Sequence, residues 1–150
     1  MDLILWRHAE AEDGLPDLER RLTPRGQKHA ARVADWLLQR LPAKFTVLAS
    51  PARRAQETAR ALGVAVHTVG TLAPGASVRD VLAAAEWPER KGAVVLVGHQ
   101  PDLGCAAAFL VSGTESAWSV KKGGLWWLSD RAREDGAQVV VRAVVTPDFV

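Results

Sequence analysis

The sequence predicts an α/β fold: a single domain over residues 1–150, in which helices cover both faces of a mostly parallel sheet. Three short runs, at residues 3–6, 45–49 and 93–97, are apolar without alternation, as expected for parallel strands that are buried on both faces. Longer stretches with helical spacing lie between them. This alternation of strand and helix predicts right-handed crossover connections.

The first helix follows the first strand and carries clear start and stop signals. Thr23 is a typical N-cap, Pro24 suits the first helical position, and Pro42 ends the segment. One apolar face is expected to pack on the sheet. Its members are Ala30, Val33, Ala34, Leu37, Leu38 and Leu41.

The later elements follow the same order. Ser50-Pro51 repeats the start signal and predicts a second helix that reaches Gly63. Apolar spacing predicts a shorter helix over 78–85 and another over 103–111, on either side of the third strand. Residues 125–128 and 139–145 resemble late strands, whose order and direction the sequence leaves open.

Composition excludes several classes of protein. The 19 basic and 17 acidic residues leave a formal charge of +2, so no nucleic-acid partner is expected. No segment has the roughly 18 consecutive apolar residues of a membrane helix, and no targeting leader is recognised at the N-terminus. The single cysteine, Cys105, cannot form an internal disulfide, which favours the cytoplasm. The oligomeric state is not predicted.

Charged and polar residues follow each of the three central strands directly. Because the carboxyl ends of parallel strands meet at one edge of a sheet, where α/β folds bind ligands, these segments should converge. Two histidines, at least two arginines and two helix N-termini would then form an anion site suited to a phosphoryl group. The segments are Arg7-His8, Ser50 to Arg54, and Gly98 to Pro101. The long polar loop 9–22 is expected to flank this site; a solvated surface loop is the alternative.

Four segments in this order resemble the histidine phosphatase superfamily, which has a phosphoglycerate mutase-like fold, and within it the short SixA-like phosphohistidine phosphatases. They are residues 5–10 (Leu-Trp-Arg-His-Ala-Glu), 17–23 (Asp-Leu-Glu-Arg-Arg-Leu-Thr), 50–59 (Ser-Pro-Ala-Arg-Arg-Ala-Gln-Glu-Thr-Ala) and 97–101 (Val-Gly-His-Gln-Pro). A single Arg-His pair would carry no weight. Four ordered segments at predicted element boundaries make a specific pattern.

The resemblance implies a role for each matching residue. His8 is the nucleophile, Arg7 and Arg54 hold the phosphoryl oxygens, and His99 is a second pocket histidine. Arg20 is expected to bind substrate at the pocket mouth. Water then hydrolyses the phospho-His8 intermediate, so neither a metal nor an organic cofactor is expected.

Arg53 and Arg54 both fall in the first turn of the second helix, and successive helical residues point about 100° apart. Only one of them can face the pocket. The family pattern Ser-Pro-x-x-Arg-Ala places the phosphoryl contact at Arg54, which leaves Arg53 in solvent. Lys121 and Lys122, which precede two glycines, are interpreted as solvated.

The expected activity is hydrolysis of phosphohistidine on a protein substrate. Residues 71–77, where larger family members carry the acid that protonates the leaving group, contain no carboxylate. Glu10, Glu12, Asp17 and Asp102 remain possible substitutes. Two alternatives stay open: a phosphatase of small sugar phosphates or nucleotides, and a non-catalytic module that binds phosphate or phosphohistidine.

Overall fold

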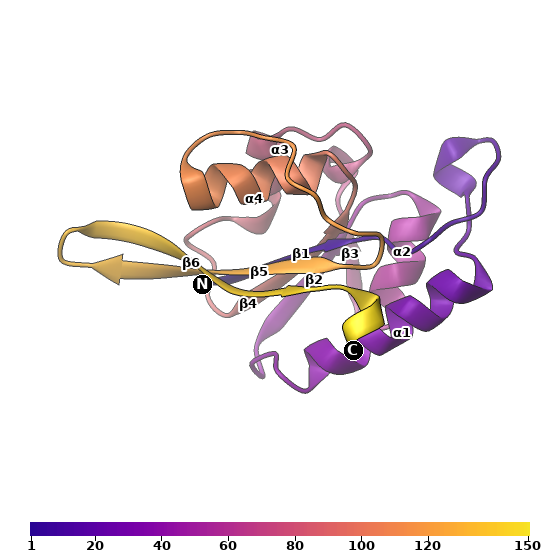
Figure 1. Cartoon of the computed structure of the whole chain (residues 1–150), viewed down its shortest axis with the longest axis horizontal. Coiled ribbons are helices and arrows are strands. Elements are labelled where there is room, and N and C mark those ends of the chain that lie inside the picture. Colours follow the sequence, from indigo (N-terminus) through magenta and orange to yellow (C-terminus); the bar gives the residue numbers. More distant parts are fainter.

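The computed structural model describes residues 1–150, except for the side chain of Arg133. Strands and helices alternate along the chain as far as α4, and two further strands follow (Figure 1). The strands are β1 (Asp2–Arg7), β2 (Phe45–Ala49), β3 (Val66–Thr68), β4 (Ala93–Gly98), β5 (Leu125–Arg133) and β6 (Gly136–Val145). The α-helices are α1 (Pro24–Leu38), α2 (Arg53–Arg60), α3 (Val78–Ala85) and α4 (Asp102–Ser112). Short 3₁₀ helices span Asp17–Glu19, Gly70–Leu72 and Pro147–Phe149.

The six strands form one sheet in the order β3-β2-β4-β1-β5-β6. The first four of these are parallel to their neighbours, whereas β5 runs antiparallel to β1, and β6 antiparallel to β5. The predicted α/β class with a mostly parallel sheet is therefore confirmed. The two late strands pair as an antiparallel hairpin, and both are longer than their apolar cores indicated.

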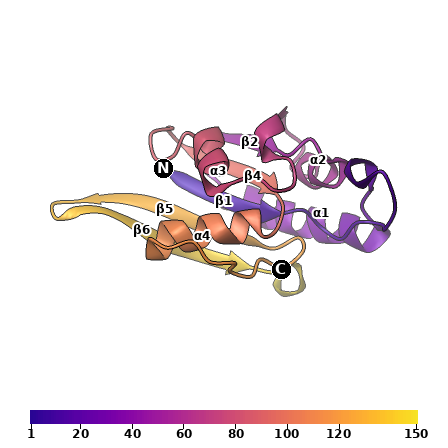
Figure 2. The same ribbon diagram turned by 90° about the horizontal axis from the view of Figure 1, so that it is seen from above.

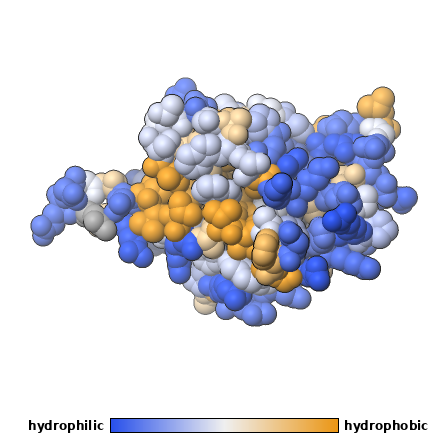
Figure 3. All heavy atoms as spheres, in the orientation of Figure 1, coloured by the Kyte–Doolittle hydropathy of each residue, from blue (hydrophilic) through white to orange (hydrophobic). Residues whose placement is uncertain are grey.

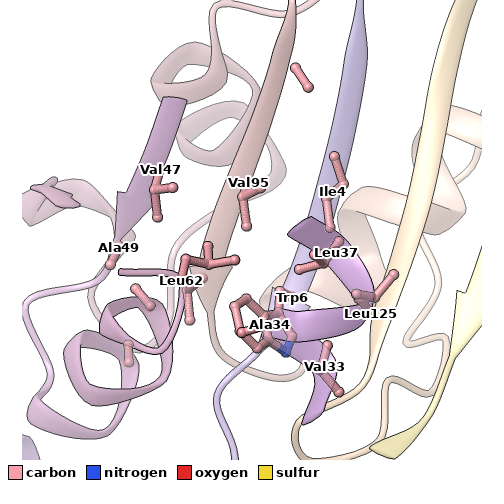
Figure 4. Packing of buried hydrophobic residues seen from close by; sticks show 14 of the residues in the cluster. Ile4, Trp6, Val33, Ala34, Leu37, Val47, Ala49, Leu62, Val95 and Leu125 are labelled. Carbon is pink, nitrogen blue, oxygen red and sulfur yellow. The ribbon is translucent and has the colours of Figure 1, made fainter. Parts of the chain in front are cut away.

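Helices cover both faces of the sheet, with α1 and α2 on one face and α3 and α4 on the other (Figures 1 and 2). Successive strand residues point to opposite faces, so each strand feeds both cores. Ile4 and Trp6 pack with Leu37 of α1 (Figure 4). Leu3 and Leu5 belong to the second core.

Two details of the helix predictions were wrong. Thr23 caps α1 as predicted, because its side chain accepts from the Gly26 amide. The helix ends at Leu38, however, before the predicted stop at Pro42, and Leu38 is 43% exposed although it was assigned to the apolar face. The second helix was predicted to start at the Ser50-Pro51 signal and to reach Gly63, but α2 begins only at Arg53 and ends at Arg60. The Ser50 hydroxyl instead accepts from the Ala52 amide in the turn before the helix.

The strand β6 lies at the edge of the sheet and exposes apolar side chains. Val144 is 53% exposed and Val141 is 39% exposed, and apolar atoms gather over β5 and β6 in Figure 3. Among the residues that the structure describes, no helix is long and apolar enough to cross a membrane.

Candidate active site

The register of the parallel strands brings three strand ends to one place. Arg7 lies opposite Gly98 in the β1–β4 pair, and Ala49 lies opposite Val97 in the β2–β4 pair. The residues that follow β1 and β4 therefore leave the sheet at the same level, and the residue that follows β2 leaves it one position earlier. These residues are His8, Ser50 and His99, and the imidazole rings of His8 and His99 are 5.2 Å apart between centroids.

The His8 imidazole is buried and held in one orientation. Its Nδ1–H donates to the Ala9 carbonyl at 2.7 Å, which leaves the lone pair on Nε2. The Nε–H of Arg54 donates to that nitrogen at 3.3 Å. His8 therefore presents an unprotonated nitrogen beside a guanidinium group, an arrangement that suits attack on an anionic phosphoryl group.

Arg54 is 4% exposed, and both of its terminal nitrogens are engaged. One donates to the Asp17 carbonyl at 2.8 Å, and the other contacts the Asp17 carboxylate at 3.1 Å and His99 Nδ1 at 3.5 Å. Arg53, one position earlier in α2, points away and forms a partly exposed ion pair with Glu57 at 3.4 Å. The structure thus places Arg54 at the two histidines and Arg53 outside.

His99 is held by Ser50, the residue that follows the neighbouring strand β2. If its Nδ1 accepts from Arg54, its Nε2–H donates to the Ser50 hydroxyl at 2.7 Å. The Ser50 hydroxyl, which the sequence offered as a helix cap, instead orients this histidine. Both imidazoles are then neutral, and each has one nitrogen directed at Arg54.

Burial and neighbouring cations keep both histidines neutral. Burial lowers the pKa of His8 to about 4, with further lowering from the charges of Arg54 and Arg7. Burial, followed by the proximity of His8 and Arg54, lowers the pKa of His99 to about 3. At neutral pH the His8 Nε2 lone pair is therefore available for attack.

These pKa values predict that the folded protein loses stability in mild acid. An unfolded histidine takes up a proton near pH 6.5, but the folded His8 and His99 resist protonation until about pH 4 or below. Stability should therefore be full above pH 6.5 and fall as pH drops toward 4, by at most about 3 kcal/mol for each histidine at pH 4.5. Urea unfolding at a series of pH values measures this effect.

The matched variants for this measurement are His8→Gln/His99→Gln and His67→Gln, the second of which removes an exposed histidine of β3. The double variant should show a shallower loss of stability between pH 6.5 and 4.5, and His67→Gln should follow the wild type. If the double variant keeps the full slope, other groups cause the acid sensitivity.

Arg7 is held by the turn that precedes β5. Its Nη1 donates to the Val120 carbonyl at 2.9 Å, whereas its buried Nε has no acceptor among the described residues. The Gly123 amide donates to the His8 carbonyl at 3.0 Å. Gly123 has a φ of +75°, and an added Cβ would lie 2.9 Å from the Pro147 side chain, so both the backbone conformation and the space of this turn favour glycine. The turn thus positions both residues of the Arg-His pair.

One pocket of about 230 Å³ contains all five residues that the sequence singled out. Three further lining residues carry polar or charged side chains that were not assigned to it. Lys122 was interpreted as solvated but lines the pocket, Gln100 directly follows His99, and Asp13 lies in the long polar loop. The lining residues are Arg7, His8, Ala11, Asp13, Arg20, Arg54, Pro74, His99, Gln100 and Lys122.

None of the four carboxylates considered as substitutes for the missing acid lines this pocket. The Asp17 carboxylate pairs with Arg54 and with Arg20 at 3.1 Å each. Desolvation of this carboxylate acts to raise the pKa of Asp17. The hydrogen bonds and positive charges of the two arginines outweigh it and lower the pKa below its ordinary value. The Glu10 carboxylate accepts from the Thr23 hydroxyl, and the Glu12 backbone carbonyl accepts from Arg20.

Asp102 binds the backbone of the loop before α3. Its carboxylate accepts from the amides of Gly75 and Ala76 at 3.0 Å each, and burial raises its pKa against the effect of these bonds. These bonds hold the loop that places Pro74 on the pocket wall.

Comparison with known proteins connects this geometry to a family. The model of the histidine phosphatase superfamily (branch 1) matches residues 3–74, a segment that contains His8, Arg20 and Arg54. A protein of Picosynechococcus sp. described as uncharacterised is 37% identical over 140 residues, which cover 83% of this chain and 82% of that protein. The chain belongs to the histidine phosphatase superfamily.

Solved structures place this histidine phosphatase among the SixA-like members. The protein histidine phosphatase SixA, in complex with tungstate, superposes with a TM-score of 0.83 and 25% identity over 99% of each chain. A proposed SixA phosphohistidine phosphatase from Nakamurella multipartitia superposes with a TM-score of 0.78 and 29% identity, over 97% of this chain and 96% of that one.

Proposed function

We propose that this histidine phosphatase hydrolyses phosphohistidine on proteins through a covalent phospho-His8 intermediate. One observation carries the proposal: His8 is neutral, its Nδ1–H is bound to Ala9, and its Nε2 lone pair points toward Arg54. The similar protein histidine phosphatase SixA forms a complex with tungstate, a tetrahedral oxyanion with the shape of phosphate, which supports a phosphoryl substrate.

The reaction proceeds in two displacements. The His8 Nε2 forms a bond to phosphorus as the bond from phosphorus to the substrate ring breaks. The substrate ring, which already carries a proton on its other nitrogen, takes the electron pair of that bond and leaves as neutral imidazole. Arg7 and Arg54 stabilise the charge on the phosphoryl oxygens during the transfer. The Arg54 Nε–H, which donates to His8 Nε2 before the reaction, turns to a phosphoryl oxygen. Water then attacks phosphorus, releases phosphate and regenerates His8.

The leaving group favours phosphohistidine over phosphate esters. A substrate ring that carries a proton on its other nitrogen leaves as neutral imidazole, a weak base whose conjugate acid has a pKa of about 6.5, whereas a serine alkoxide needs a proton donor in the site. General acid catalysis usually contributes about 10²- to 10⁴-fold, and its absence penalises esters most. We therefore expect kcat/KM for a phosphohistidine peptide to exceed that for a phosphoserine peptide or a sugar phosphate by at least about 10²-fold.

Asp13 provides the control for this comparison, because among the described residues it is the carboxylate that lines the pocket. Under the proposal, Asp13→Asn leaves phosphohistidine hydrolysis within about twofold of wild type. Efficient hydrolysis of an ester that falls sharply in Asp13→Asn would identify Asp13 as a general acid. The sugar-phosphate alternative would then replace the phosphohistidine assignment.

A further inference from the structure

Three hollows follow one another across the surface, from the catalytic pocket to the outer face of α1. The catalytic pocket shares Arg7 and Lys122 with a second hollow of about 670 Å³. The second hollow shares Arg25 and His29 with a third of about 380 Å³. We call six residues of this path the basic band: Arg7, Lys122, Lys121, Arg25, Lys28 and Arg32.

The basic band carries more positive charge than the carboxylates that line the same hollows can neutralise. All of its members except Arg7 are exposed, and none forms an ion pair with a described residue. Glu10 and Asp148 line the second hollow, but Glu10 accepts from the Thr23 hydroxyl. Asp13 lines the catalytic pocket, so three carboxylates in all face the six cations along the path.

Another hollow of the molecule has the opposite balance of charge. The cavity between α3 and α4, of about 560 Å³, has three carboxylates among its lining residues and a single arginine. The whole chain carries a formal charge of only +2. A band of six cations that ends in the catalytic pocket is therefore a local feature and does not reflect a generally basic surface.

An aromatic side chain adds to this surface. Phe149 lines the second hollow and is 86% exposed. Protein interfaces are enriched in aromatic residues and arginine, and a large exposed aromatic ring beside cations is typical of such a surface. The band thus combines charge, hollows and an apolar contact.

We propose that the basic band binds an acidic surface of the protein that carries the phosphohistidine. This inference rests on the proposed function, which makes the substrate a protein whose phosphoryl group occupies one end of the band. Arg25, Lys28 and Arg32 follow the i, i+3, i+7 spacing of one helix face, so they extend the band in one direction from the pocket. An acidic segment that flanks the phosphohistidine reaches them.

Synthetic phosphohistidine peptides test this proposal. Each peptide carries one phosphohistidine between two flanks of about ten residues, long enough to span roughly 33 Å when extended. The flanks are rich in glutamate in one peptide and in serine in the other. We expect wild-type kcat/KM to be on the order of tenfold higher for the acidic peptide, and the difference to shrink in high salt.

The variant Lys28→Glu/Arg32→Glu should reduce this preference to unity or below and leave hydrolysis of the serine-flanked peptide unchanged. Both residues lie outside the catalytic pocket. The matched control is Lys44→Glu/Lys91→Glu, which makes the same change in charge just before β2 and β4, at the opposite edge of the sheet. This control should retain the wild-type preference.

The outcomes separate the two proposals. If the wild type hydrolyses both peptides equally well, or if the band variant keeps the preference for glutamate flanks, the basic band does not bind the substrate and the proposed function stands. If the wild type hydrolyses neither peptide, the proposed function is wrong and this inference is wrong with it. Competition by single-stranded RNA that is stronger than that by an unphosphorylated acidic peptide would assign the band to nucleic acid instead.

Discussion

His8→Ala is expected to lower kcat/KM by on the order of 10⁴-fold or more for every substrate that the wild type hydrolyses. Loss of a covalent nucleophile removes the whole two-step route, and the surrounding cations then act only on direct attack by water. No neighbour can replace it from its present position, because His99 directs one nitrogen at Arg54 and the other at Ser50. Steady-state phosphate release measures the loss.

Rapid quenching followed by mass spectrometry under conditions that preserve acid-labile phosphate should locate the intermediate. In the wild type the phosphoryl group is expected on His8. The control is His67→Ala, which removes an exposed histidine of β3 and should retain wild-type turnover. Phosphate found only on another residue, together with an active His8→Ala, would refute the mechanism.

The parts of the site that the sequence predicted are those that depend on local order along the chain. The segments after β1, β2 and β4 were expected at one edge because parallel strands share a direction, and the register of Arg7 with Gly98 places His8 and His99 at the same level. The separation of Arg53 from Arg54 likewise needed only helical geometry and a family pattern.

Contacts between distant segments could not be predicted in this way. The turn at Lys122 and Gly123 reaches His8 only because β5 pairs beside β1, and the sequence did not fix that pairing. Ser50 looked like a helix cap because its local sequence favours one. In the folded chain the hydroxyl also lies 2.7 Å from His99, and the helix begins at Arg53.

Arg54→Ala is expected to reduce kcat/KM by roughly 10³-fold, whereas Arg53→Ala should stay within about twofold of wild type. Loss of a charged contact to the transition state costs on the order of 3 to 4 kcal/mol in a buried site, which corresponds to two to three orders of magnitude in rate. Arg54 contacts both pocket histidines, and Arg53 only pairs with Glu57 at the surface. Parallel kcat and KM measurements on both variants give the comparison.

Because Arg54 is buried and also holds Asp17, the alanine variant changes more than one contact. Arg54→Lys keeps the positive charge but removes the planar fork that reaches Asp17, His8 and His99 together. We expect it to remain folded, by circular dichroism and thermal unfolding, and still to lose at least about tenfold in kcat. A fully active Arg54→Lys would reduce the role of Arg54 to charge alone. Equal losses in Arg53→Ala and Arg54→Ala would contradict the assignment, since of the two arginines only Arg54 contacts the His8 nitrogen that we propose attacks phosphorus.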